Sequence, residues 1–383
     1  MLHSTPRFHP RPSLYRRIKT KLFLELKCVS ISNSGQKPYL RHRSTPGEYE
    51  PTNLTLKHPC SDHYPLDLYR ASISFGNEGR KRRTERETAE DEATDLLDKD
   101  KGEDRIELSI ILPESEETVA NIFSMLGKPD EDPHWADVWH GGIALNEYLV
   151  SSSSTDGGGV GGSLVRGKRV LELGCGVGLT GVLCAMEGAK KVTMTDREPF
   201  ACYCAIASAI ANGFASVARA LDEDARVVDG LTQMDASLLD DIVYSNRSSE
   251  CDCVEARIMN WFKLDEYLKE EDDFAYDVVI ACDCLYCEEA VEAVASIVFE
   301  AFSRRQRQEG KGVNNTSLSS PFTFLLADPP SRFPQNHEKF LNIMQEKIGV
   351  SDVEKEDTLL AVRNPFQRDE GEMVVKICKY TFL

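Results

Sequence analysis

An alternation of short apolar runs with longer helical segments, from residue 169 to the end, constrains the fold of this chain most. We predict strands at 169–173, 191–196, 253–259, 276–283, 322–328 and 372–382, and helices at 178–188, 202–213, 288–305 and 336–349. Continuous apolar strands that alternate with helices indicate a mostly parallel sheet with helices on both faces. Ligands of such a sheet bind at the carboxyl ends of its strands.

The chain before this region has a different composition, and we predict that residues 1–104 are largely disordered. Residues 1–47 carry ten Lys or Arg and a single acid, Glu25, which is typical of a mitochondrial or plastid transit peptide. An untargeted basic tail has the same composition, and the protein would then be cytoplasmic. Residues 80–104 are almost wholly charged and indicate a solvated linker. The folded domain is expected at 105–383, beginning with a half-buried strand and carrying an acidic insert at 221–250.

Charge and composition disfavour several classes of partner. The formal net charge of −18 repels phosphate backbones, so nucleic acid is a disfavoured partner. No run of eighteen apolar residues is present to span a membrane. The twelve cysteines are typical of reduced thiols. Cys284 and Cys287 would supply only half of a zinc site, and no second pair completes it, so we predict no metal.

The glycine-rich turn after the strand at 169–173 fits two nucleotides. Gly176, Gly178 and Gly181 spell the GxGxxG of dinucleotide-binding enzymes, and Asp196 follows Gly176 by twenty residues. Counted from Gly174, the same stretch is ExGxGxG, a pattern usual for S-adenosylmethionine. The dinucleotide frame forces Gly174 into the strand and lacks a downstream group for hydride transfer, so we favour the second frame.

Charged or special residues stand at the carboxyl ends of four predicted strands. They are Glu172 and Gly174 at the first strand, Asp196 at the second, Trp261 at the third and Asp283 at the fourth. The carboxyl of Glu172 could accept the amino group of a bound amino acid, and that of Asp196 both hydroxyls of a ribose. An amine together with a ribose describes S-adenosylmethionine. Each residue also has a structural interpretation, because glycine turns serve packing and an Asp can cap the next helix.

Four blocks in order make the sequence similar to a known family. They are PHWADVWHGGIALNEYL at 133–149, VLELGCGVGLTG at 170–181, MNW at 259–261 and YDVVIACDCLY at 276–286. Together they resemble the seven-strand methyltransferases of the lysine methyltransferase family 16 group. The resemblance implies a Rossmann-like seven-stranded sheet and S-adenosyl-L-methionine as cofactor. It also implies that Trp139 and Trp261 flank the cofactor, that Cys282 lies beside the adenine, and that the remaining cofactor contacts come from Glu172, Gly174, Cys175, Gly176, Gly178 and Asp196.

In this family the DxxY motif, here Asp283 to Tyr286, borders the acceptor site. Asp283 can orient an amine and help its proton leave, and Tyr286 can hydrogen-bond nearby. The alternative for Tyr286 is a half-buried ring that packs on the following helix. The turn Asp328-Pro-Pro-Ser-Arg332 is expected either to line the substrate mouth or to be a plain turn.

The resemblance therefore implies methyl transfer to a lysine side chain of a protein substrate. Two alternatives stay open at this level. One is a methyltransferase of the same fold that acts on a nucleic acid or a small molecule, and the other is a non-catalytic binding module.

Overall fold

The computed structural model describes residues 49–58, 61–76, 106–125, 127–153, 163–214, 218–221, 251–268, 274–311, 321–349, 352–367 and 371–382. The basic segment 1–47, the charged linker 80–104 and residues 222–250 of the acidic insert lie outside the described residues. The targeting signal therefore stays a prediction. Within the described part of the chain, no helix has the length and apolar character needed to cross a membrane.

The larger of two sheets has the strand order β10-β11-β9-β8-β4-β5-β7-β6. Neighbouring strands from β9 to β6 run parallel, and β11 is antiparallel to both of its neighbours. The predicted mostly parallel α/β sheet is confirmed, and the short edge strand β6 adds to the seven expected strands. The strands are β4 (Arg169–Leu173), β5 (Lys191–Asp196), β6 (Ala218–Leu221), β7 (Cys253–Ile258), β8 (Val278–Cys282), β9 (Phe322–Asp328), β10 (Val353–Arg363) and β11 (Glu372–Phe382).

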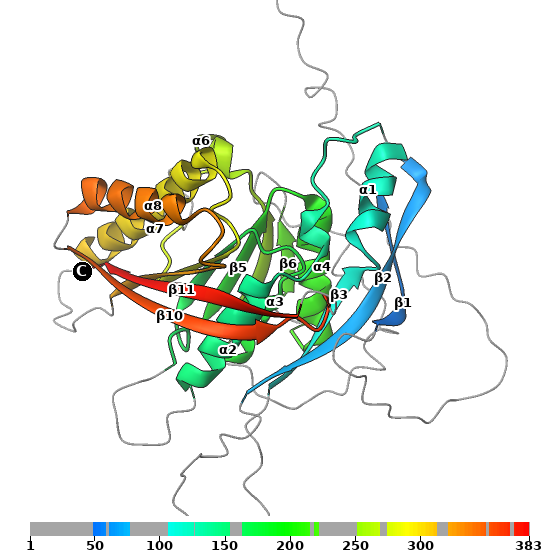
Figure 1. The fold of residues 1–383 in the computed structure, drawn as a ribbon, viewed down its shortest axis with the longest axis horizontal. Coiled ribbons are helices and arrows are strands. Elements are labelled where there is room, and N and C mark those ends of the chain that lie inside the picture. The colour runs from blue at the N-terminus through cyan, green and yellow to red at the C-terminus, as the bar shows by residue number, and fades with distance from the viewer. Residues whose placement is uncertain are drawn as a thin grey trace, which may run out of the picture.

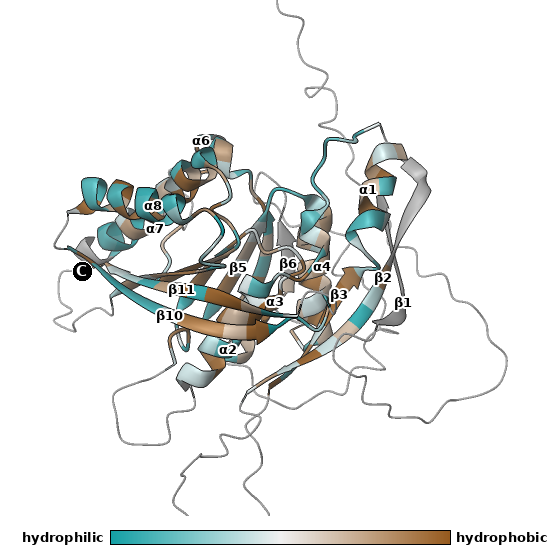
Figure 2. Cartoon of the chain, viewed as in Figure 1, coloured by the Kyte–Doolittle hydropathy of each residue, from teal (hydrophilic) through white to brown (hydrophobic). Residues whose placement is uncertain are grey.

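Helices cover both faces of this sheet (Figure 1). One apolar core joins it to α2 (His140–Ser153), α3 (Leu179–Met186) and α4 (Pro199–Ala211). A second core joins the opposite face to α7 (Glu288–Lys311) and α8 (Pro334–Ile348). Figure 2 shows the hydrophobic residues gathered in the sheet and many hydrophilic residues along α8. This distribution is expected when apolar strands are buried between two layers of amphipathic helices.

The strand order reverses direction between β4 and β8. The chain leaves β4 through α3 to β5 on one side, and leaves β8 through α7 to β9 on the other. Chain segments diverge where such a reversal occurs, so a crevice opens at the carboxyl ends of the two strands. Residues that follow β4 and β8 are therefore placed at a potential ligand site.

The smaller sheet consists of β1 (Tyr49–His58), β2 (Ser61–Phe75) and β3 (Ile106–Pro113), all antiparallel. The first two strands fall within residues 1–104, where we expected a largely disordered segment, so the structure differs from that expectation here. The physical reason is tertiary pairing, because the alternating Ala71, Ile73 and Phe75 of β2 become buried against the core when β2 pairs with β3. The expected strand from residue 105 is β3.

Polar side chains of α4 cover the outer edge of β3. The amide of Asn212, just after α4, accepts from the Ser109 N–H (3.0 Å) and donates to the Ser109 carbonyl (2.6 Å). One turn earlier, the Ser208 hydroxyl accepts from the Ile111 N–H (2.9 Å). An unpaired strand edge exposes backbone donors and acceptors, and here the helix satisfies them. The small sheet is thereby attached to the main domain.

We predict that Asn212→Ala lowers the free energy of unfolding by about 1–3 kcal/mol, because it leaves the Ser109 N–H and carbonyl without their partner. Urea denaturation of the full chain measures the change. The control is Ser151→Ala, which removes an exposed hydroxyl on α2 and should change stability by less than about 0.5 kcal/mol. Equal effects of the two substitutions would contradict the role of Asn212.

Candidate functional site

A cavity of about 500 Å³ opens at the carboxyl ends of β4, β5 and β8. Its volume is within the range of small-molecule sites. Ten of the eleven residues predicted for the site line it, which are Trp139, Glu172, Gly174, Cys175, Gly176, Asp196, Trp261, Cys282, Asp283 and Tyr286. Residues that are up to 147 positions apart in the sequence, such as Trp139 and Tyr286, thus meet in one place.

Gly178 is the predicted residue that the structure does not bring to the cavity wall. It precedes α3 with φ +82°, and a Cβ there would come within 2.7 Å of the Ala205 Cβ on α4. Its glycine identity is therefore explained by a left-handed backbone and by close packing between two helices. Gly174, with φ +63°, does line the cavity, and a Cβ on it would lie 3.1 Å from the ring of Trp261.

Glu172 lies at the buried end of the cavity, where β4 meets α3. Its Oε2 accepts from the N–H of Gly181 in the first turn of α3 (3.0 Å). Burial raises the pKa of this carboxyl to about 8, and the charge of nearby Asp196 adds to the effect. A buried acid in this state gains from a cationic ligand, which would favour its ionised form.

Asp196 ends β5, and backbone donors hold both of its carboxyl oxygens. Oδ2 accepts from the Gly176 N–H and Oδ1 from the Glu198 N–H, each at 3.0 Å. These bonds tie the glycine turn to β5 and orient the carboxyl, while burial raises its pKa. A carboxylate has about four acceptor positions, so two such bonds leave capacity for further donors such as hydroxyls.

Asp283, directly after β8, adopts φ +54°, a left-handed conformation that is uncommon for residues other than glycine. This turn directs its carboxyl toward α2, where Oδ2 accepts from the N–H of Gly141 (3.1 Å). The first turn of a helix favours a negative charge. Burial nevertheless raises the pKa of Asp283 to about 7, with the charge of Asp328 adding to it and Arg332 opposing it.

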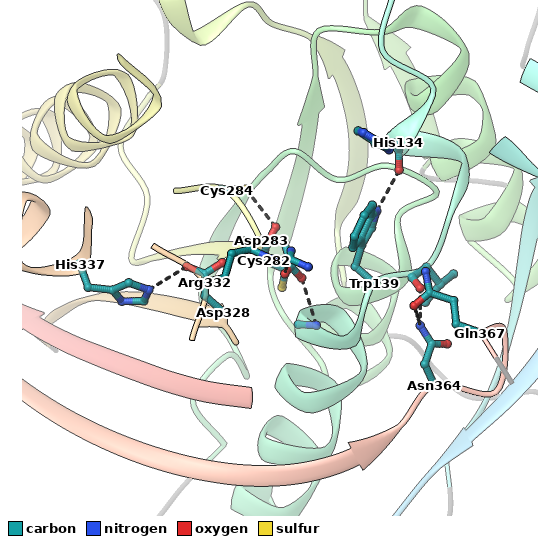
Figure 3. Close-up of polar contacts among 12 residues, drawn as sticks. His134, Trp139, Cys282, Asp283, Cys284, Asp328, Arg332, His337, Asn364 and Gln367 are labelled. Carbon is teal, nitrogen blue, oxygen red and sulfur yellow. Dashed lines mark hydrogen bonds and ion pairs between the residues drawn. The ribbon is translucent and has the colours of Figure 1, made fainter. Parts of the chain in front are cut away.

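Arg332 completes this cluster from the loop between β9 and α8. Its Nη1 donates to Asp283 Oδ1 at 2.7 Å, and its guanidinium carbon lies 5.3 Å from the centre of the Trp139 ring (Figure 3). The Trp139 indole is held in turn by donating to the His134 carbonyl (2.9 Å). The predicted alternative in which the Asp328–Arg332 turn lines the mouth therefore agrees with the structure, since Arg332 and Phe333 both border the cavity.

Three exposed aromatic side chains stand at the cavity. Phe262 is 47% exposed, Tyr286 is 44% exposed and Phe333 is 40% exposed, and all three line it. They come from three separate segments, which follow β7, β8 and β9. The exposed fraction of 44% for Tyr286 is consistent with both interpretations of this residue, so the packed ring stays an alternative prediction. We call these three residues the aromatic rim.

All three tryptophans of the chain line the cavity, and two carry buried indole N–H groups. Neither the Trp135 nor the Trp261 indole nitrogen has a hydrogen-bond partner among the described residues. Buried donors are usually paired, so unpaired ones beside a cavity indicate a missing acceptor such as water or a ligand. The described part of the chain holds no group of three or more His, Cys, Asp or Glu side chains arranged for a metal ion.

Several lining residues were missed from the sequence. Glu198 caps α4 by accepting from the Phe200 N–H, and burial raises its pKa to about 7. Its position directly before Pro199 is a helix-start signal, but nothing in the sequence placed it at a ligand. Gly141, which donates to Asp283 without lining the cavity itself, was missed because its partner is 142 residues away.

Comparison with known proteins gives a consistent result for part of the chain. A family model described as lysine methyltransferase matches residues 132–251, which confirms the predicted resemblance for this stretch. The chain is 41% identical over 73 residues to the electron transfer flavoprotein beta subunit lysine methyltransferase of Mus musculus, covering 19% of this chain and 25% of that protein. It is 42% identical over 64 residues to the protein N-lysine methyltransferase METTL21A of Danio rerio, covering 17% and 25%.

The chain thus spans about a quarter of the length of these curated relatives (25% in both). Among solved structures, a SAM-dependent methyltransferase from Agrobacterium tumefaciens aligns with a TM-score of 0.35 and 14% identity, covering 64% of each chain.

We predict that Gly141→Ala lowers the free energy of unfolding by about 1–3 kcal/mol, because its Cβ would collide with Asp283 Oδ2 and lie 2.7 Å from the Ala327 carbonyl oxygen. The neighbouring Gly142→Ala is a matched control, since a Cβ there would lie 3.7 Å from its nearest neighbour, Leu179 Cδ2. Helix propensity should make this control neutral or stabilising by up to about 1 kcal/mol. Thermal unfolding compares the two variants, and equal stability would show that Asp283 does not need this glycine.

Proposed function

We propose that this chain is an S-adenosyl-L-methionine-dependent methyltransferase whose acceptor is a lysine side chain of a protein. One observation carries the proposal: acids suited to an amine and a ribose, Glu172 and Asp196, line the same cavity as Asp283 and Tyr286 of the DxxY motif. A cofactor-binding half and an acceptor half thus share one space. The match to a lysine methyltransferase family model and the names of the relatives support the same activity.

The cavity residues fit this cofactor by their chemistry. Glu172 would accept from its amino group and Asp196 from its ribose hydroxyls, each with acceptor capacity beyond the backbone bonds described above. The unpaired indole N–H groups of Trp135 and Trp261 supply buried donors at the same walls. When bound, the cofactor supplies an electrophilic methyl group, which forms a bond to the amine nitrogen as its bond to sulfur breaks.

The protein residues must deliver a neutral amine in line with that methyl group. A lysine arrives as an ammonium, and the ionised Asp283 carboxylate can bind it and then take a proton from it. Because burial raises the pKa of Asp283 to about 7, this carboxyl is a better proton acceptor than an exposed aspartate. Tyr286, at the aromatic rim, can hydrogen-bond to the substrate from the solvent side.

The aromatic rim favours a protein substrate over a small molecule. Three large rings exposed by 40–47% around one cavity form apolar surface outside the space that a small acceptor needs. Tyr, Trp and Phe are enriched where proteins bind each other. A nucleic acid is disfavoured by charge, since the described lining residues include six acids (Asp132, Asp137, Glu172, Asp196, Glu198 and Asp283) and two arginines (Arg197 and Arg332).

Incubation of the full chain with tritiated S-adenosylmethionine and a cell lysate tests the proposal directly. We expect label on protein, located on lysine by mass spectrometry. Label confined to RNA or to small molecules would contradict a protein-lysine acceptor. Absence of cofactor binding in calorimetry would contradict a methyltransferase of any kind.

Asp196→Ala should weaken S-adenosylmethionine binding by about 10- to 100-fold, because hydrogen bonds to a charged group contribute about 1.5–3 kcal/mol. Calorimetry with wild type and variant measures the difference. Glu117→Ala, which removes an exposed acid on α1 (Glu116–Met125) outside the cavity wall, is the control and should leave the affinity nearly unchanged. If both variants bind as well as the wild type, Asp196 does not contact the cofactor.

Asp283→Asn should lower the turnover number by about 10²–10⁴-fold while cofactor affinity is retained, because the amide cannot accept the proton. In the wild type, the carboxyl is ionised above its pKa of about 7 and neutral below it. We therefore expect the methylation rate to fall as pH decreases through about 7, and the variant to lose this step. A pH–rate profile in which wild type and variant show the same step would assign it to another group.

A further inference from the structure

The guanidinium of Arg332 is bound by Asp283, which belongs to the acceptor half of the cavity, and by Trp139, which the resemblance places beside the cofactor. It forms an ion pair with Asp283 at 2.7 Å and lies over the Trp139 ring at 5.3 Å. Asp283 is the hydrogen-bond partner of this guanidinium among the described residues. In Figure 3 the side chains of Arg332, Asp283 and Trp139 lie close together. An internal cation thus already uses one acidic and one aromatic side chain where the acceptor half meets the cofactor half.

We propose that Arg332 is an internal substitute for the substrate's ammonium group, and that Asp283 and Trp139 form a cation subsite from which the incoming side chain displaces it. This inference rests on the proposed function. A carboxylate beside an aromatic face binds ammonium as well as guanidinium groups, so the ammonium of a lysine side chain can take the place of the Arg332 guanidinium. Arg332 then determines specificity, because an uncharged side chain gains too little to displace it.

The buried charges behind the subsite favour a cation beside Asp283. The side chains of Asp283 and Asp328 are only 9% and 5% exposed. The charge of Asp328 adds to the rise in the pKa of Asp283, and the charge of Arg332 opposes the rise at both carboxyls. His337 Nε2 lies 3.2 Å from Asp328 Oδ2, on the side of Asp328 away from Arg332. Removing one partner of a buried ion pair leaves an uncompensated charge, which is strongly destabilising. Exchange of a guanidinium for an ammonium avoids that state.

The loop that carries Arg332 allows this exchange. Residues 329–333 form a turn closed by the Arg332 N–H and the Pro329 carbonyl (2.9 Å), and Phe333 adopts φ +49° before α8 begins. The side chain of Arg332 is 34% exposed, in contrast to that of Asp283. The arginine therefore reaches into the cavity from the solvent side and can return to water without unfolding a helix or a strand.

The test measures binding of Nα-acetyl-lysine-N-methylamide to the full chain with saturating S-adenosylhomocysteine, by ligand-observed NMR. The norleucine analogue, which has no charge, is the blank. We expect Arg332→Gln to bind the lysine probe about tenfold more tightly than wild type, because the subsite is no longer occupied. Arg332→Lys keeps a cation and should bind close to wild type. Thermal unfolding confirms that each variant is folded.

Arg197→Gln is the matched control, since Arg197 also lines the cavity but pairs with Asp132 at 3.8 Å. It should bind the probe as the wild type does, and adding Asp283→Asn to Arg332→Gln should abolish the gain. The inference is overturned if Arg332→Gln binds the probe no better than wild type. It is also overturned if Arg197→Gln or the norleucine probe shows the same gain.

These outcomes are separate from the proposed function. If the wild type transfers methyl groups but Arg332→Gln does not change the affinity for the lysine probe, the proposed function is supported and the role of Arg332 as an internal substitute is rejected. If the chain does not bind S-adenosylmethionine, the proposed function is rejected. Lysine-probe binding by wild type and Arg332→Gln without cofactor would then still test whether Arg332 occupies a cation subsite.

Discussion

The interaction on which the rest of the site depends is the placement of the Asp283 carboxyl between the first turn of α2 and Arg332. A left-handed backbone at the end of β8 directs it there, and the absence of a side chain at Gly141 allows the approach. Three separate parts of the chain, α2, β8 and the loop after β9, are thereby held around one carboxyl. An acid that is buried yet paired on both oxygens is oriented, and it keeps a pKa near the pH at which proton transfer is useful.

Burial acts on every acid that lines the deep part of this cavity in the same direction. It raises the pKa of Glu172, Asp196, Glu198 and Asp283. Concentrating four carboxyls in one cavity is unfavourable unless cations neutralise them. The cofactor and acceptor of the proposed reaction both bring positive charge, and Arg332 provides it on the acceptor side. The electrostatics of the cavity therefore favour cationic ligands before any particular ligand is considered.

The central strands could be predicted because each is a continuous apolar run buried on both faces. Among the strands that the sequence did not reveal, β10 and β6 lie at the two edges of the larger sheet. In β10, Val353–Arg363, charged residues fall on both faces, and Leu359 is exposed because one side of an edge strand faces water. The four residues of β6 are too few to show a pattern, and β2 is stabilised by a pairing with β3 across a charged intervening segment. The pairing of these strands depends on partners that the local sequence does not specify.

For the site, the sequence by itself determined the chemistry, namely a glycine turn with Glu172, an acid after β5, and DxxY after β8. This was possible because strand ends are local features, and parallel strands bring their carboxyl ends to one edge. Only the tertiary structure decided which glycines line the cavity, and Gly178 is not among them. It also decided that Gly141 and Arg332 donate hydrogen bonds to Asp283. Those relations join residues 49 and 142 positions apart, and such contacts follow from helix and loop packing rather than from any local pattern.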